Sequence, residues 1–196
     1  MFKINFIDSL GYLAILIIAL SLFSLGMSFT GRATDSGIVN ITIANTVSIN
    51  FTIDSINFGS GSVNLGSNSA TIDTLGNVVS GNWTPVRPGF VLENIGNTNV
   101  TLDLKSGKNA EQFLGGTNSG YFYRVTNNKT GSCVQGDIVL GTWNNVNIAG
   151  DGDLVCDSFG FALNANAINI DIKLVIPSDA RIGVQSDIFT ATGTAI

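Results

Sequence analysis

The 196-residue sequence contains no histidine, only two cysteines and three prolines, and few charged side chains. Nine Lys and Arg residues against 14 Asp and Glu residues give a charged fraction of 12% and a net charge of −5. Without histidine there is no Ser-His-Asp or Cys-His catalytic site, and two cysteines cannot form a four-thiolate zinc site. An acidic chain with few cations also lacks the means to bind a phosphate backbone. We therefore expect no enzyme activity, no cofactor and no nucleic-acid partner.

The stretch from Ser9 to Gly31 contains no charged residue and is rich in Leu and Ile. As a helix, 23 residues would span about 35 Å, enough to cross a hydrocarbon layer of roughly 30 Å. Residues 1–33 therefore predict either a cleaved signal peptide or a retained N-terminal anchor, which would span the membrane through residues 10–29. In both cases we expect the remainder of the chain to be extracellular or at the cell surface.

The residue pattern changes to a period of two after the apolar stretch. Between Val39 and Ile53 the odd positions are almost all apolar and the even positions mostly polar, as in a half-buried strand. Fifteen residues is long for one strand. The stretch therefore either bends near Asn45-Thr46 within its own domain, or its first half leaves the domain as a donor strand that fills a groove in a neighbouring copy. The apolar positions of this expected assembly strand are Val39, Ile41, Ile43, Val47, Ile49, Phe51 and Ile53.

Further strands are expected in short alternating runs that Gly, Asn and Ser separate, and no run after residue 33 has helical periodicity. The sequence thus predicts an all-β fold: an antiparallel two-sheet sandwich of jelly-roll or Greek-key type, forming a single domain over residues 34–196 and preceded by one apolar helix. The expected strands are Ala70–Leu75, Gly89–Asn94, Asn99–Lys105, Tyr121–Thr126, Asp137–Trp143, Phe159–Asn164, Ile168–Ile176 and Val184–Thr194.

The two cysteines, Cys133 and Cys156, are expected to form a disulfide, because the chain has the features of an exported protein. Five Asn-x-Thr sequons are glycosylation candidates, although a chain this rich in Asn and Thr produces several by chance. The candidate asparagines are Asn40, Asn50, Asn82, Asn99 and Asn128.

Two other groups of residues permit a function but do not select one. Asp151, Asp153 and Asp157 resemble part of a calcium loop, but the twelve-residue spacing and the closing Glu are missing, so a solvated turn is the simpler interpretation and no metal site is expected. Four aromatic residues could stack on a sugar or belong to the core: Trp83, Tyr121, Tyr123 and Trp143.

Three segments carry a resemblance to known proteins: IANTVSINFTIDSINFGSG, FVLENIGNTNVTLDL and IKLVIPSDARIGVQSDIFTATGT. Together with the leader they resemble small exported surface proteins of archaea and, more distantly, camelysin/TasA-like fibre subunits and archaeal bundling pili. That resemblance implies a jelly-roll subunit that polymerises by passing an N-terminal strand to its neighbour. The layout is also similar to archaeal type IV pilins and archaellins, although only Lys3 precedes the apolar run where those precursors have several basic residues.

These observations favour a non-catalytic structural protein, the subunit of a pilus-like surface filament or coat that associates with copies of itself. One alternative is a membrane-anchored monomeric adhesin or glycan-binding module. Another is a pilin-like or archaellin-like subunit whose filament core is helical, and a third is a hydrolase with an unrecognised carboxylate pair.

Overall fold

The computed structural model describes residues 11–18 and 38–196. Contacts divide the chain into two units, Met1–Thr42 and Ile43–Ile196, and each is described by itself. Residues 11–18 are helical and exposed. In the described part of the chain, no helix has both the length and the apolar character needed to cross a membrane. The expected signal peptide or anchor, residues 1–33, lies largely outside the described residues.

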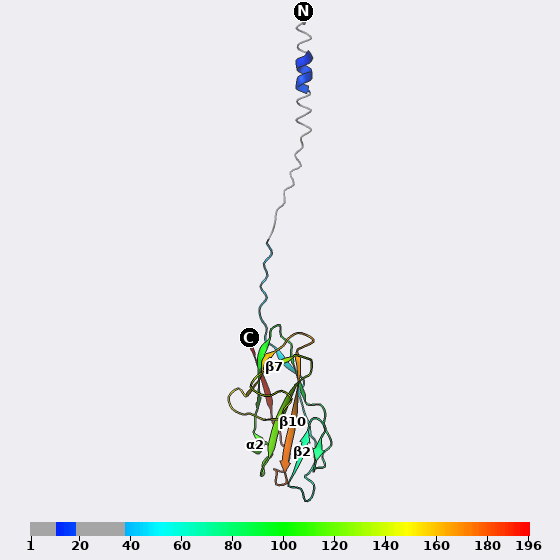
Figure 1. Ribbon diagram of the computed structural model, residues 1–196, viewed down its shortest axis with the longest axis vertical. Coiled ribbons are helices and arrows are strands. Elements are labelled where there is room, and N and C mark those ends of the chain that lie inside the picture. The colour runs from blue at the N-terminus through cyan, green and yellow to red at the C-terminus, as the bar shows by residue number, and fades with distance from the viewer. Residues whose placement is uncertain (1–10, 19–37) are drawn as a thin grey trace, which may run out of the picture. The chain divides into compact units, whose positions relative to one another are not determined.

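The second unit is a sandwich of two antiparallel sheets, as the sequence predicted (Figure 1). The seven-stranded sheet contains β1 (Ile49–Ile53), β2 (Ser69–Asp73), β3 (Val78–Val79), β4 (Phe90–Asn94), β6 (Gly120–Asn127), β8 (Asn144–Asn145) and β10 (Ala167–Pro177). The four-stranded sheet has the order β11-β5-β9-β7, with bounds Phe189–Ala195, Val100–Ser106, Asp153–Phe159 and Cys133–Gln135.

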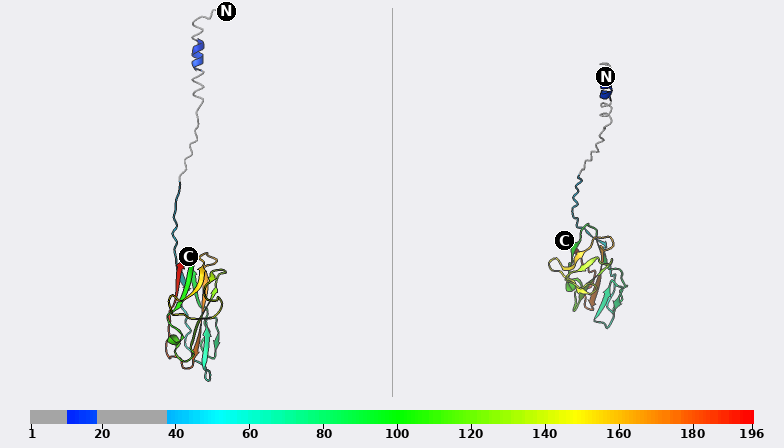
Figure 2. Two further views of the ribbon diagram at one scale, coloured as in Figure 1. Left: turned by 60° about the vertical axis from the view of Figure 1, so that its left-hand side comes forward. Right: turned by 45° about the horizontal axis from the view of Figure 1, so that its top comes forward.

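The longest strand, β10, organises the larger sheet. One edge of β10 pairs with β6 from Ile168 to Val175. The other edge pairs first with β4, from Ala167 to Ile170, and then with β2, from Lys173 to Pro177. β4 and β2 thus follow one another along the same side of β10, so the sandwich has a β4 end and a β2 end. Figure 1 shows β2 and α2 (Ala110–Leu114) at one end of this unit and the C-terminus at the other, and both views in Figure 2 agree.

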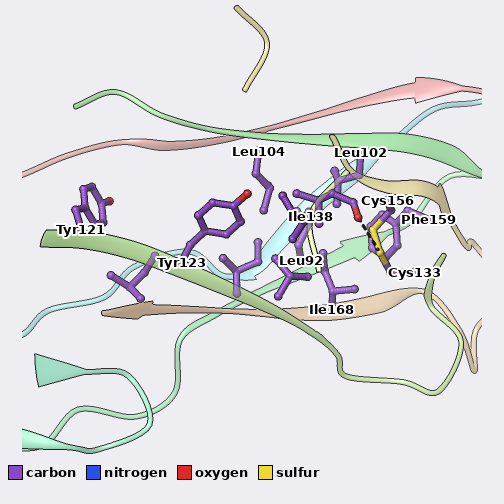
Figure 3. Close-up of a cluster of buried hydrophobic side chains, with 14 of the residues drawn as sticks. Leu92, Leu102, Leu104, Tyr121, Tyr123, Cys133, Ile138, Cys156, Phe159 and Ile168 are labelled. Carbon is purple, nitrogen blue, oxygen red and sulfur yellow. Dashed lines mark hydrogen bonds between the residues drawn. A yellow bond between two sulfur atoms is a disulfide. The ribbon is translucent and has the colours of Figure 1, made fainter. Parts of the chain in front are cut away.

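The core lies between the sheets and consists of the inward-facing side chains of alternating strands. Leu102, Phe159 and Ile168 are fully buried, and the core continues to Tyr123 and Tyr121. Figure 3 shows this row of side chains, with the Cys133–Cys156 disulfide at one end and Tyr121 at the other. Alternation along β5 gives the strict buried and half-buried pattern that the sequence of this strand predicted.

Several expected strands have different bounds in the structure. Asp137–Trp143 is irregular, because its amides bond to separate neighbours: that of Asp137 donates to Leu154 and that of Gly141 to Val125. The strand expected at Phe159–Asn164 instead ends at Phe159, and the last strand begins at Phe189. Helix α2 was not expected from the sequence; its capping box, Asn109 with Gln112, is the local signal that periodicity overlooked.

Candidate assembly site

The expected long strand Val39–Ile53 is divided into two halves in the structure. Only Ile49–Ile53 forms a strand, β1, which pairs with β4. The odd residues of this half pack on the body, where the ring of Phe51 lies 5.6 Å from that of Phe90. Only the second half of the stretch is therefore paired as a strand in the described residues.

Residues 38–43, here called the apolar segment, form no strand with any other described residue. Their apolar side chains face solvent: Val39 is 93% exposed, Ile41 83% and Ile43 75%. The sequence contains no charged residue from Ser36 to Ile53. A strand with alternating apolar side chains, no charge and unpaired backbone is the kind of edge that folded proteins usually cover.

The turn between β4 and β5 fixes the point where the apolar segment joins the body. Asn97 accepts a hydrogen bond from the Thr46 amide at 2.6 Å through Oδ1, and its Nδ2 donates to the Ala44 carbonyl at 3.0 Å. Gly96 lies so close that a Cβ built on it would be 2.3 Å from the Thr46 carbonyl oxygen. The Asn-x-Gly-Asn motif of the sequence thus anchors residues 44–48.

Asn94, the first residue of this motif, is fully buried and has partners for both ends of its amide. Its Nδ2 donates to the carbonyls of Thr98 and Phe159 at 3.0 and 3.1 Å, and its Oδ1 accepts from the Gly96 amide at 3.0 Å. The Phe159 carbonyl belongs to the other sheet, so the Asn94 side chain joins the two sheets beside the site where residues 44–48 are held. A buried amide is tolerated here because its donors and acceptor are paired.

The β2 end of the sandwich contains a groove of about 1130 Å³. Its floor is formed by the inner face of β10 and β2, through Ile172, Leu174, Ile176 and Ile72. Two irregular segments, residues 56–67 and 180–187, form its walls, and α2 closes one end. The half-buried apolar side chains that line it and pack against the core are Ile56, Phe58, Trp83, Phe90, Phe113 and Ile176.

A carboxylate clamp holds the turn after β10 beside the groove. The Asp179 carboxylate accepts hydrogen bonds from the Thr117 amide, at 2.9 and 3.1 Å, and from its hydroxyl at 2.9 Å. These donors lower the pKa of Asp179 below its usual value, because they stabilise the ionised form. The clamp joins the chain that follows α2 to the chain that enters the wall at residue 180.

The expected disulfide is confirmed. Cys133 and Cys156 are bonded with their Cα atoms 5.4 Å apart, and they join β7 to β9 in the smaller sheet. A disulfide is typical of an oxidising compartment. Figure 3 shows it at the end of the core opposite Tyr121, a residue that lines the groove.

The other candidate residues of the sequence are dispersed. Asp153 accepts from Tyr123 and Asn147, and across the described residues no group of three acidic, Cys or His side chains could hold a metal ion. Tyr121 and Tyr123 belong to the core, where burial raises the pKa of both, while Trp143 lies beside Lys173 and Arg124. The sequon residues Asn40, Asn50, Asn82 and Asn128 are exposed, and Asn99 is half-buried.

The groove was not identified from the sequence. Ile56 and Phe58 continue the alternation of β1 after a two-residue interruption, and the Gly- and Ser-rich residues 59–69 follow them. The sequence contains this pattern, but the pattern does not show that these residues lack a strand partner in the fold.

The chain matches no protein-family model, no curated protein and no solved structure.

Proposed function

We propose that this protein is an exported, non-catalytic structural subunit that assembles with copies of itself into a surface filament or coat through the apolar segment. The observation that carries the proposal is the exposure of Val39, Ile41 and Ile43 at alternate positions of an uncharged segment that forms no strand with another described residue. Such a segment can add to a neighbouring protein as a strand, through main-chain hydrogen bonds and through side-chain sites at alternate positions.

The energy available from this segment is sufficient for a specific contact. Burying one Val or Ile side chain contributes about 1.5–3 kcal/mol, and four such residues occur between Ile38 and Ile43. Association costs several kcal/mol in lost motion, so the segment needs most of its side chains buried and its backbone paired. A loose surface contact would not provide this, whereas insertion as a strand does.

Location outside the cytoplasm is supported by two features. The disulfide indicates an oxidising compartment, and the uncharged stretch from Ser9 to Gly31 has the composition of an export signal or anchor. Low charge on the body limits repulsion between packed copies. These features favour a subunit that is exported first and assembled afterwards.

Electron microscopy of the purified full-length protein tests the proposal, with the variant Ile41→Asp beside wild type. We expect filaments or sheets from wild type, and discrete particles from the variant because a charge on the buried face of an inserted strand is costly. Since Ile41 is exposed in the single chain, the melting temperature of the variant should equal that of wild type.

Ala44→Asp is the matched control. It places the same charge on the opposite face of the strand and, like Ile41→Asp, keeps the Asn40-x-Thr42 sequon. We expect it to assemble. Discrete particles from wild type at high concentration would contradict the proposal and favour the monomeric adhesin, and a large loss of melting temperature in Ile41→Asp would show that the segment belongs to its own fold.

A further inference from the structure

We propose that the groove at the β2 end is the acceptor for the apolar segment of a second copy, so that subunits join head to tail. This inference rests on the proposed function and specifies the surface on which assembly takes place. Four properties of the described residues support it: the spacing of side chains, the charge, the unpaired backbone of the walls, and the distance between the turn that holds residues 44–48 and the groove.

The spacing of the apolar side chains matches on the two partners. Val39, Ile41 and Ile43 occupy alternate positions of the apolar segment, and Ile172, Leu174 and Ile176 occupy alternate positions of the groove floor. Each set covers about 13 Å of extended chain at 3.3 Å per residue. The volume of about 1130 Å³ exceeds the range of roughly 300–1,000 Å³ usual for small-molecule sites, as an acceptor for a peptide segment requires.

Charge is balanced on both sides of the proposed contact. The apolar segment carries none, and the charged side chains that line the groove are Arg181 and Asp187, which have opposite signs. Insertion therefore leaves no charge of the segment buried without a partner. A small acidic or basic ligand would find no corresponding excess of charge in the groove.

The walls offer backbone groups with which a strand can pair. No backbone amide from Ile182 to Asp187 donates a hydrogen bond to another described residue, and the same holds for Ile56, Asn57 and Phe58 in the opposite wall. Leu174 in the floor is 3% exposed. The incoming strand therefore enters between the walls and pairs with their edges, where irregular chain opens at low cost.

The distance from Thr46, where the chain is held to the sandwich, to the groove points to a second copy as the source of the apolar segment. Thr46 is held beside Gly96 and Asn97. Asn94 lies just before these two residues, and its backbone amide donates to the carbonyl of Asn166. From Asn166 to Ile172 is about 20 Å along β10, whereas Ile43 lies at most about 10 Å of chain from Thr46. Ile43 cannot reach the floor of its own groove, so the three apolar side chains fill it only from another molecule.

Cysteine trapping between full-length subunits tests this arrangement. Subunits carrying Ile41→Cys are mixed with subunits carrying Phe58→Cys and mildly oxidised, after the native disulfide and melting temperature of each have been checked. We expect a crosslinked dimer in the mixture and none in either preparation alone. The control partner is Val134→Cys, an exposed apolar position on β7 in the smaller sheet, which should give no crosslink.

The possible results test the acceptor groove and the proposed self-assembly separately. If wild type forms filaments but the Phe58→Cys pair crosslinks no better than the Val134→Cys pair, the groove is not the acceptor and the proposed function stands. If a double variant of one chain, Ile41→Cys with Phe58→Cys, crosslinks only within the monomer at high dilution, the segment occupies its own groove and a second copy is excluded. If wild type never assembles, the proposed function fails first.

Discussion

At the scale of single residues, polar side chains with complete hydrogen bonding determine where the apolar elements lie. Asn94 is the clearest case, because it is fully buried and its amide bonds to three backbone groups across two sheets. Asn97, three residues later, is exposed and bonds to residues 44 and 46. The two asparagines look equivalent in sequence, yet one stabilises the body and the other positions the apolar segment.

Substitution of these two asparagines by alanine should therefore have different effects. Asn94→Ala removes the side-chain donor of two buried carbonyls and an acceptor of the Gly96 amide, and a buried polar group left unpaired costs about 1–3 kcal/mol. We expect the free energy of unfolding, measured by urea titration, to fall by more than about 2 kcal/mol in line with that cost. Asn97→Ala removes exposed hydrogen bonds and should change it by less than about 1 kcal/mol. Equal effects of the two substitutions would contradict this assignment.

Asp179 should give the fold a pH dependence of known sign. Its pKa is lower in the folded protein than in the unfolded chain, so the ionised clamp to Thr117 stabilises the fold above the unfolded pKa of about 3.9. That stability is lost as the pH falls through the folded pKa. Asp179→Asn should therefore lower the melting temperature modestly at pH 7, and the difference from wild type should shrink below pH 4.

The control for this pH dependence is Asp54→Asn. Asp54 is exposed and its carboxylate accepts no hydrogen bond from another described residue, so its substitution should leave the difference in melting temperature near zero at both pH values. Melting curves recorded by circular dichroism at pH 7 and pH 3 provide the comparison. An Asp179→Asn deficit that persists at pH 3 would show that the side chain acts through packing and not through its charge.

At the scale of elements, the turn between β4 and β5 holds residues 44–48 against the sandwich. A Cβ at position 96 would lie 2.3 Å from the Thr46 carbonyl oxygen and 3.0 Å from the Ser48 amide nitrogen, both of them backbone atoms. Gly96→Ala should therefore displace residues 44–48 and speed proteolytic cleavage there, measured by mass spectrometry of timed digests. Gly193→Ala, whose Cβ would meet only side chains at 3.4 Å and beyond, is the control and should leave the cleavage rate unchanged.

The sequence predicted elements well where one pattern determined the result. Alternation in Asn99–Lys105 predicted β5, which the structure places at Val100–Ser106, and the cysteine pair with the export features predicted the disulfide. Alternation alone could not show that Val39–Ile53 separates into a free half and a paired half, because both halves carry the same pattern. The groove depends on which segments lack a partner in three dimensions, and no local pattern contains that information.

At the scale of the whole molecule, the turn that holds residues 44–48 and the groove lie at opposite ends of β10, so the proposed contact would join two different surfaces. The Ile196 amide bonds to the Asn99 carbonyl, so the C-terminus is beside that turn, while Pro177 at the far end of β10 lines the groove. An interface between two different surfaces is heterologous, and it generates open filaments unless the rotation closes a ring. An isologous contact would instead stop at a dimer.

This geometry predicts that a subunit with a groove but no functional donor terminates growth. Ile41→Asp accepts the segment of a wild-type subunit and offers none in return, so every incorporated copy should end one filament. Addition of a tenth as much Ile41→Asp as wild type should shorten filaments to about ten subunits, because each heterologous contact is required for the next. Filament lengths measured by electron microscopy check this, with Ala44→Asp as the control that leaves length unchanged. An isologous interface would give dimers and no filaments. Filament lengths that fall merely in proportion to the wild-type concentration would contradict head-to-tail growth.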